Sequence, residues 1–295
     1  MISALAAGSQ QAHPADARAR AIRDVGAIAA SAVQCLMLEL ETWPKPGLVS
    51  HIDCGSHRDM DAGTFRSSVS AIAPYFDDMA QAGGGGCGMG CLRIIGLEAE
   101  AAMLSATSGV NTHRGAIFGM GLLCAAAGAR AGGQVGPGLS LGATVSRLWG
   151  ASIVNGPVLL HSHGGNARRR FGAGGARMEA AEGFPSVYEV GLPALRLAAS
   201  AVPDDAEAAR IEACFALIAA LEDTNLLHRG GPAGLRFARQ SARRFLDAGG
   251  IRAAGWRDRA RAVHESFIAR RLSPGGSADL LAMTLFVAAN DKDPR

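Results

Sequence analysis

Four consecutive polar residues, Asn111, Thr112, His113 and Arg114, precede an almost wholly apolar run over 115–129. Asn is a common N-cap, because its side-chain oxygen accepts a hydrogen bond from an unpaired amide of the first helical turn. With Asn111 as cap, His113 and Arg114 would lie at the N-terminus of a buried helix, where free amides and the helix dipole favour anions. The motif predicts a site for a phosphate-bearing ligand. An ordinary cap beside a solvated arginine is the alternative.

A second polar cluster, His57-Arg58-Asp59-Met60-Asp61, combines an imidazole and a guanidinium with two carboxylates. The carboxylates can converge if one residue is the N-cap of a helix and the other lies just outside it. Such a cluster could hold Mg²⁺ through its oxygens or supply a general base. Acidic residues that merely complement the dipole at a helix start are the alternative.

Glu39 and Glu41 lie at the end of a predicted helix, where the dipole disfavours acids. Local conflicts of this kind tend to collect at functional sites. Lys45 follows between Pro44 and Pro46, on a stiff extended connection. As a point charge held in place, Lys45 is expected to contact a phosphate.

Two further motifs occur late in the chain. Asp223-Thr224-Asn225 closes a predicted helix, and its short polar groups could cap that helix or bind a metal; Arg229 follows, beside two glycines. Ser273-Pro274-Gly275-Gly276 predicts another helix start, with Pro at the first helical position. The glycines would let a backbone approach a phosphate closely. Asp279 in that first turn complements the helix dipole.

The elements that would position these residues are helices. Ala and Gly dominate the 295 residues, aromatic residues make up 5%, and β-branched residues rarely cluster, which favours closely packed helices. A short segment at 152–160 is a β-like candidate. The N-terminal segment 1–15 is expected to lack fixed structure. We predict one all-α domain over 16–290 around a central buried helix near 113–130. Apolar spacing predicts helices at 16–41, 59–82, 91–106, 113–130, 139–150, 192–200, 204–221, 232–248, 255–271 and 277–289.

Composition excludes several function classes. The net charge of +3 is too small to indicate nucleic-acid binding, and the longest apolar run is too short to span a bilayer. Cys87 and Cys91 have no matching second pair of ligands, so a zinc site is not expected. The spacing Gly83-x-Gly85-x-x-Gly88 follows a helical pattern instead of a strand, which excludes a dinucleotide fingerprint. With no secretory signal and six cysteines expected to be reduced, we predict a cytoplasmic protein.

Taken together and in order, the motifs at 39–50, 55–61, 111–118, 223–225 and 273–279 resemble the triphosphoribosyl-dephospho-CoA synthase family. The resemblance runs from Glu39 to Asn290. The malonate decarboxylase branch is more similar than the citrate lyase branch, which tends to carry Lys where this chain has Arg114. Met178 stands where the family has a small residue before Glu179, and this departure leaves the role of Glu179 open.

The resemblance implies that ATP and 3′-dephospho-CoA react to give 2′-(5″-triphosphoribosyl)-3′-dephospho-CoA and adenine. A phosphoribosyl-dephospho-CoA transferase would then pass the product to the acyl-carrier subunit of malonate decarboxylase. An α-linked product from β-configured ATP implies inversion in a single displacement, with an acid and a base on opposite faces of the sugar. Mg²⁺ is expected to accompany ATP, because few basic residues cannot neutralise a triphosphate in a buried cleft.

In this context we expect the following residue roles. The catalytic residues are Asp59, Asp61, His57 and Glu39. The substrate and phosphate contacts are Lys45, Asn111, Thr112, His113, Arg114, Arg229, Ser273, Gly275 and Gly276. The metal ligands are Asp61, Asp223, Asn225 and Asp279.

Two other functions compete with this one. A metal-dependent N-glycoside hydrolase of the ADP-ribosylglycohydrolase type could share an all-α fold and acidic loops, but would use water in place of a 2′-hydroxyl and would not need dephospho-CoA. A non-catalytic assembly factor for the decarboxylase would not require Lys45, His113 and Asp59 in polar loops beside glycines. The sequence leaves a homodimer open.

Overall fold

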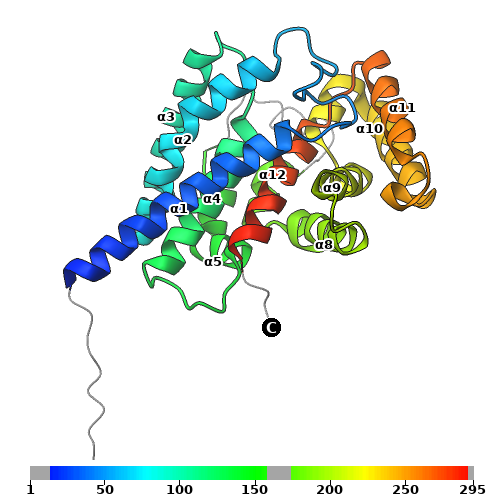
Figure 1. Cartoon of the computed structure of the whole chain (residues 1–295). Helices are drawn as coiled ribbons and strands as arrows, with labels where there is room; N and C mark the ends of the chain where they lie inside the picture. The colour runs from blue at the N-terminus through cyan, green and yellow to red at the C-terminus, as the bar shows by residue number, and fades with distance from the viewer. Residues whose placement is uncertain (1–13, 158–173, 292–295) are drawn as a thin grey trace, which may run out of the picture.

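The computed structural model describes residues 14–157 and 174–291, and these form helices and loops with no strand (Figure 1). The predicted all-α fold is therefore confirmed. Besides one π-helix at Ser186–Gly191 and one short 3₁₀-helix at Gly250–Arg252, the helices are α1 (Pro14–Leu40), α2 (Ala62–Gly84), α3 (Met89–Ala106), α4 (Arg114–Ala131), α5 (Leu141–Val154), α7 (Gly175–Ala181), α8 (Leu192–Ala201), α9 (Ala206–Ala220), α10 (Thr224–Asp247), α11 (Trp256–Ala269) and α12 (Gly275–Asn290).

Helix α4 is the centre of the fold. Its residues from Ala116 to Ala129 are buried, with only Phe118 partly exposed. A helix that is apolar on every side must be covered on every side, and α1, α2, α3, α5 and α12 all pack against it. The prediction of a buried central helix near 113–130 is confirmed.

Small residues let α2 and α4 approach until their backbones touch. A Cβ atom added to Gly128 of α4 would lie 1.9 Å from the carbonyl oxygen of Ala80, and one added to Gly83 of α2 would lie 1.9 Å from that of Ala125. Neither position has room for a side chain. The close approach of this helix pair therefore requires glycine at these two positions.

This contact predicts that Gly128→Ala destabilises the protein by about 1–3 kcal/mol, because the methyl group meets a backbone carbonyl that cannot turn aside. Gly96→Ala is the matched control, since a Cβ there would meet only the Met79 side chain at 3.6 Å. The control should be neutral or stabilising by up to about 1 kcal/mol. Urea unfolding of both variants measures the difference, and equal midpoints would show that α2 and α4 are not in backbone contact.

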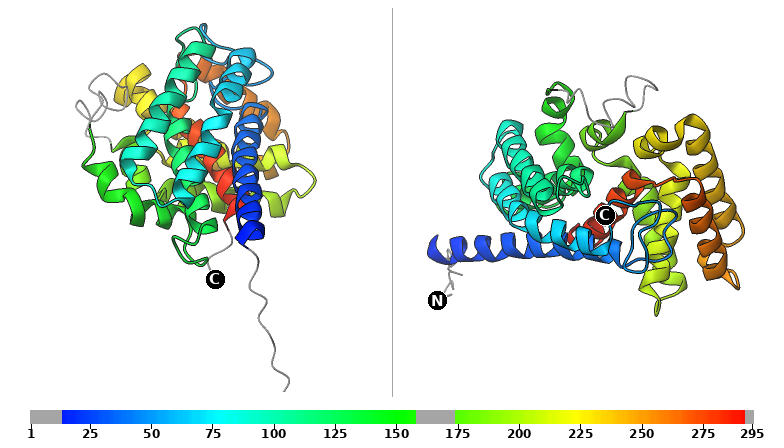
Figure 2. Two further views of the ribbon diagram at one scale, coloured as in Figure 1. Left: turned by 90° about the vertical axis from the view of Figure 1, so that its left-hand side faces the viewer. Right: turned by 90° about the horizontal axis from the view of Figure 1, so that it is seen from above.

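Helix α12 joins two groups of helices. It packs against α1 and α4 on one side and against α9 on the other, and α9 in turn packs against α8 and α10. Figure 1 shows α12, in red, between the group α2–α5 and the group α8–α11. The view from above in Figure 2 shows the same two groups, with α1 in blue along one side. Helix α12 is therefore in contact with both groups.

Three predictions about elements are corrected. The β-like candidate at 152–160 is wrong where the structure describes it, because Ser152–Val154 form the end of α5; residues 158–160 lie outside the described part. The motif at 223–225 begins α10 instead of closing a helix, because α9 has already ended at Ala220 and the Asp223 carboxylate caps the next helix. Of the segment 1–15, residues 14 and 15 belong to α1 and the others lie outside the described residues.

Within the described ranges, no helix has both the length and the apolar character needed to cross a membrane.

Helix α10 changes direction at Gly231, whose φ of 59° and ψ of −164° are not helical. Pro232 follows and lacks the amide that would continue the helical hydrogen bonds. The first turns of α10, which carry Asn225 and Arg229, are set apart from the rest of the helix.

Candidate active site

A cleft of about 410 Å³ lies where the helix ends meet. Its wall is formed by the last turn of α1, the loops at 48–60 and 109–113, and the first turns of α4, α10 and α12. Asp59, His113 and Asp279, which come from three separate motifs, all line it, so the structure brings these motifs together. The other predicted site residues in the wall are Glu39, His57, Asn111, Thr112, Arg114, Asn225, Arg229, Ser273 and Gly275.

The N-termini of α4, α10 and α12 contribute to one cleft, and the positive end of each helix dipole favours anions. At α4, the Asn111 side chain accepts a hydrogen bond from the backbone N–H of Arg114 (3.2 Å), as expected, although the N-cap residue is His113. Arg114 donates from Nε to Glu100 (2.9 Å). That ion pair holds the arginine in the cleft wall.

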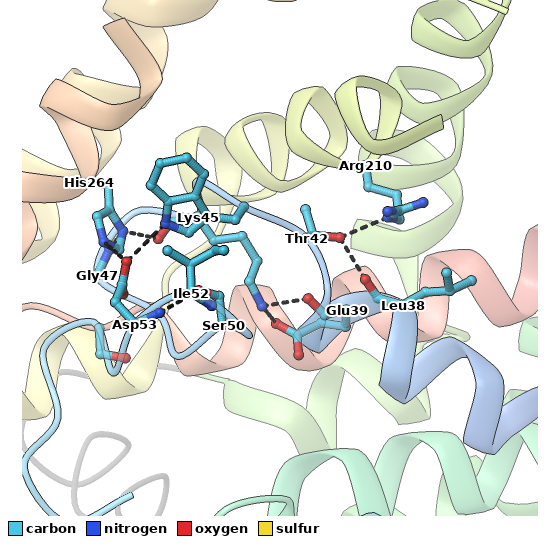
Figure 3. Close-up of polar contacts among 12 residues, drawn as sticks. Leu38, Glu39, Thr42, Lys45, Gly47, Ser50, Ile52, Asp53, Arg210 and His264 are labelled. Carbon is cyan, nitrogen blue, oxygen red and sulfur yellow. Dashed lines mark hydrogen bonds and ion pairs between the residues drawn. The ribbon is translucent and has the colours of Figure 1, made fainter. Parts of the chain in front are cut away.

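Lys45 has no exposed surface and does not line the cleft. Its Nζ donates to the backbone oxygen of Glu39 (2.6 Å) and pairs with Glu39 Oε1 (Figure 3). This departs from the prediction of a direct phosphate contact, because the ammonium is already satisfied by Glu39. Burial raises the pKa of Glu39 by more than Lys45 lowers it. Lys45 thus holds one carboxylate oxygen of Glu39, which lies in the cleft wall.

Polar contacts connect the loop that carries Lys45 to α11 (Figure 3). His264 of α11 donates from Nδ1 to the Lys45 carbonyl (2.6 Å), and its Nε2 lies 3.2 Å from an Asp53 carboxylate oxygen. The Trp43 indole N–H donates to the same Asp53 oxygen (2.9 Å), and the Arg261 guanidinium lies 5.0 Å from the Trp43 ring centre. Trp43 is therefore a packing residue of this loop.

Asp279 of α12 lies over the start of α4. A Cβ atom on Gly115 would come within 2.0 Å of Asp279 Oδ2, so only glycine leaves room for this carboxylate. Asp279 accepts a hydrogen bond from the Ala116 backbone, but burial, followed by the charges of Glu39 and Asp223, raises its pKa well above the ordinary value. Gly115 was not predicted as a site residue; its place directly after Arg114 in the motif was the available signal.

The carboxylates of Asp61 and Asp223 are engaged as helix caps. Asp61 is exposed, lies outside the cleft wall and bonds to the Thr64 backbone and hydroxyl, which lowers its pKa. Asp223 accepts from the amides of Asn225, Leu226 and Ser277 and from the Ser277 hydroxyl. Asp61 departs from its predicted catalytic and metal roles, because it is an exposed cap outside the cleft wall. Asp223 departs from the predicted metal role, because both of its oxygens already have donors.

The glycines of the Ser273 motif have a steric role that the sequence did not indicate. A Cβ on Gly275 would lie 2.9 Å from the Asn225 side chain, and one on Gly276 would lie 3.1 Å from Asp223. Gly276 is outside the cleft wall. These glycines allow the starts of α10 and α12 to pack side by side.

His57, Arg229 and Ser273 form a chain of contacts on one side of the cleft. Arg229 donates to His57 Nδ1 (3.1 Å), and His57 Nε2 lies 2.9 Å from the Ser273 hydroxyl. Burial and Arg229 lower the pKa of His57, although Asp59, 3.5 Å from Nδ1, opposes them. A neutral His57 that accepts at Nδ1 donates from Nε2 to Ser273. The Ser273 hydroxyl hydrogen is then available to a ligand.

His113 is buried and lies edge-on to Phe65, with ring centres 4.8 Å apart. Burial, with a smaller contribution from the Lys45 charge, lowers its pKa to about 4. The imidazole is therefore neutral at physiological pH. The phosphate contact predicted for His113 would have to come from an uncharged N–H donor.

The buried His113 predicts a loss of stability in acid. Because its pKa falls from 6.5 in the unfolded chain to about 4 on folding, its contribution is complete above pH 6.5 and is lost as the pH drops through this window. The expected loss is about 3 kcal/mol. His113→Asn, which keeps an acceptor near Nδ1, should lose correspondingly less. Urea midpoints from pH 7 to pH 4 measure both slopes, and parallel slopes would show that His113 does not titrate in this window.

Among the described residues, no group of three or more His, Cys, Asp or Glu is placed to hold a metal ion. The predicted set of Asp61, Asp223, Asn225 and Asp279 does not assemble, since Asp61 and Asp223 are caps. Three carboxylates remain in the cleft wall, those of Glu39, Asp59 and Asp279. Glu39 and Asp279 have raised pKa values in a buried setting, and the Asp279 carboxylate is suited to a divalent cation shared with phosphate oxygens.

The chain matches a family model described as ATP:dephospho-CoA triphosphoribosyl transferase over residues 26–294. A relative from Pectobacterium atrosepticum, named 2-(5''-triphosphoribosyl)-3'-dephosphocoenzyme-A synthase, is 42% identical over 84% of each chain. A relative from Stutzerimonas stutzeri, named "Probable 2-(5''-triphosphoribosyl)-3'-dephosphocoenzyme-A synthase", is 41% identical over 87% of this chain and 89% of its own. No solved structure matches. The polar cleft and these similarities lead to one conclusion: the chain belongs to the ATP:dephospho-CoA triphosphoribosyl transferase family.

Proposed function

We propose that the cleft binds ATP with its triphosphate against the N-termini of α4, α10 and α12 and transfers the triphosphoribosyl group to 3′-dephospho-CoA. The observation that carries this proposal is that three helix starts, Arg114 and Arg229 share the cleft with Glu39 and Asp279. Backbone amides and guanidinium groups bind phosphate. Carboxylates are the groups that a displacement at the anomeric carbon requires.

Glu39 is the base in this proposal. Lys45 holds its Oε1, its other oxygen remains for the cleft, and its raised pKa suits removal of a proton from the ribose 2′-hydroxyl of dephospho-CoA. The 2′-oxygen attacks the anomeric carbon of ATP as the bond to adenine breaks. Adenine leaves with the bonding electrons and takes up a proton from solvent, and the triphosphate stays intact. A single displacement of this kind inverts the configuration.

Asp279 is the cation-binding carboxylate. No basic side chain among the described residues pairs with it, whereas one oxygen of Glu39 is already held by Lys45. When bound, Mg²⁺ would supply charge neutralisation for the triphosphate. Calorimetry of ATP binding with and without Mg²⁺ tests this role separately from catalysis. Asp279→Asn should lose the Mg²⁺-dependent part of the affinity, and Glu39→Gln should keep it.

We infer that the product serves a malonate decarboxylase through a phosphoribosyl-dephospho-CoA transferase. The support is the resemblance of the motifs to that branch, including Arg114 where the citrate lyase branch tends to carry Lys. Supplying the purified product to the transferase and acyl-carrier subunit of each system tests the choice. Preferred loading of the citrate lyase carrier would contradict it.

Product analysis separates transfer from hydrolysis. With ATP and 3′-dephospho-CoA, mass spectrometry should detect adenine and the triphosphoribosyl adduct in equal amounts. With ATP alone, adenine release should fall by at least about 100-fold, because water is not the intended nucleophile. Ribose triphosphate formed at the same rate without dephospho-CoA would show a glycohydrolase instead, and the absence of any turnover would favour an assembly factor.

A further inference from the structure

Ser68 of α2 is a buried polar residue, and both of its side-chain hydrogen bonds among the described residues lead to the cleft. It has no exposed surface. Its hydroxyl lies 2.7 Å from His113 Nδ1, and it accepts a hydrogen bond from the Thr112 hydroxyl at 2.7 Å. Thr112 and His113 both line the cleft, whereas Ser68 does not. Ser68 therefore acts on a ligand only through these two residues.

The Ser68 hydroxyl takes part in two hydrogen bonds but has only one hydrogen to donate, which sets the direction of each bond. The Ser68 oxygen accepts from Thr112, so the single Ser68 hydrogen is left for His113 Nδ1. A neutral imidazole that accepts at Nδ1 carries its proton on Nε2. Among the described residues no group bonds to that Nε2, and the ring forms part of the cleft wall.

We propose that Ser68 is a positioning residue that, through the relay Thr112–Ser68–His113, fixes His113 in the Nε2–H tautomer as a neutral donor to an acceptor atom of ATP. This inference rests on the proposed function for the identity of the ligand, but the tautomer itself does not. The position of Phe65 against the ring edge and the low pKa of His113 agree with a donor that stays uncharged.

The tautomer can be measured without any turnover. In the free protein labelled with ¹⁵N-histidine, long-range proton–nitrogen spectra distinguish a protonated Nε2 from a protonated Nδ1, and His113→Gln identifies the His113 signals. We expect Nε2–H in the wild type and a large Nδ1–H population in Ser68→Ala. Wild-type His113 protonated at Nδ1, or an unchanged tautomer in Ser68→Ala, would overturn the proposal.

Kinetics then test the consequence. Ser68→Ala should lower kcat/KM for ATP by about tenfold, the loss expected for one oriented hydrogen bond, with no change in KM for dephospho-CoA. If Ser68→Ala does not fold, Thr112→Val takes its place as the test and should give a smaller loss of kcat/KM. Thr112→Ser, which keeps the hydroxyl, should have the wild-type kcat/KM. Ser67→Ala, an exposed neighbour on α2, is the matched control.

The outcomes separate the two proposals. If Ser68→Ala shows a shifted His113 tautomer but keeps the wild-type kcat/KM, His113 does not act as a hydrogen-bond donor to ATP. A wild-type protein with the expected tautomer but no transfer product would contradict the proposed function and leave the relay in place.

Discussion

Asp279→Asn is expected to lower the rate of triphosphoribosyl transfer by about 10²- to 10⁴-fold, a loss typical of removing an essential active-site carboxylate. The substitution is nearly isosteric and should leave the fold intact. It should also raise the melting temperature of the metal-free protein at neutral pH by roughly 2 °C or more. Steady-state assays and calorimetric melting measure the two effects together.

The rise in stability follows from the raised pKa of Asp279. Folding moves the pKa of this carboxyl above its ordinary value of 3.8, so the folded state holds the proton more tightly than the unfolded chain. The carboxyl group therefore opposes folding at neutral pH, and this cost shrinks as the pH falls from the raised pKa towards 3.8, below which both states hold the proton. The stability that Asp279→Asn gains over the wild type should therefore shrink over the same range of falling pH.

Asp61→Asn is the matched control. Asp61 is an exposed cap outside the cleft wall, and asparagine is an equally good N-cap. The control should keep full turnover and the wild-type melting temperature. Loss of transfer in Asp61→Asn, with full activity in Asp279→Asn, would move the site to the start of α2.

Lys45→Met should destabilise the protein by about 3–5 kcal/mol, the usual cost of breaking a buried ion pair by removing one partner. Lys45 is fully buried, and within the described part of the chain its ammonium bonds only to Glu39, so the variant leaves the Glu39 carboxylate without its countercharge. Urea unfolding at pH 7.5 measures the loss.

The double variant Lys45→Met with Glu39→Gln isolates the pair. It should recover at least half of the lost stability, because a neutral amide replaces the unpaired charge. A Lys45→Met protein as stable as the wild type would show that Lys45 is not paired with Glu39 in solution, and would return it to the predicted phosphate contact.

The sequence predicted most helices because their apolar spacing is regular. The buried helix α4 was recognisable from an unbroken apolar run, and the polar motifs before α4 and α12 were recognisable as helix starts. The motif at 223–225 was assigned to the wrong end of a helix, because a short polar segment after an apolar helix looks the same whether it ends that helix or caps the next.

The sequence could not show which polar groups already have partners. Lys45 and Asp61 are residue types that often bind ligands or metals. In the structure, however, Lys45 forms an ion pair with Glu39, and Asp61 accepts a hydrogen bond from Thr64. Conversely, Ser68 lies in the middle of a helix with nothing to distinguish it from Ser67, and only the packing of α2 against the 109–113 loop brings it to His113. Such assignments depend on tertiary contacts, which local patterns do not contain.

The matched pair Gly115→Ala and Gly90→Ala tests most directly that transfer depends on Asp279 at the start of α4. Both glycines lie in the first turn of a helix, but a Cβ on Gly115 would meet Asp279 Oδ2 at 2.0 Å, whereas one on Gly90 has no neighbour within 4 Å. Product formation from ATP and 3′-dephospho-CoA should fall by at least about 100-fold in Gly115→Ala, with cooperative melting retained. Gly90→Ala should match the wild type. Wild-type product formation in Gly115→Ala would contradict the placement of the active site at this cleft.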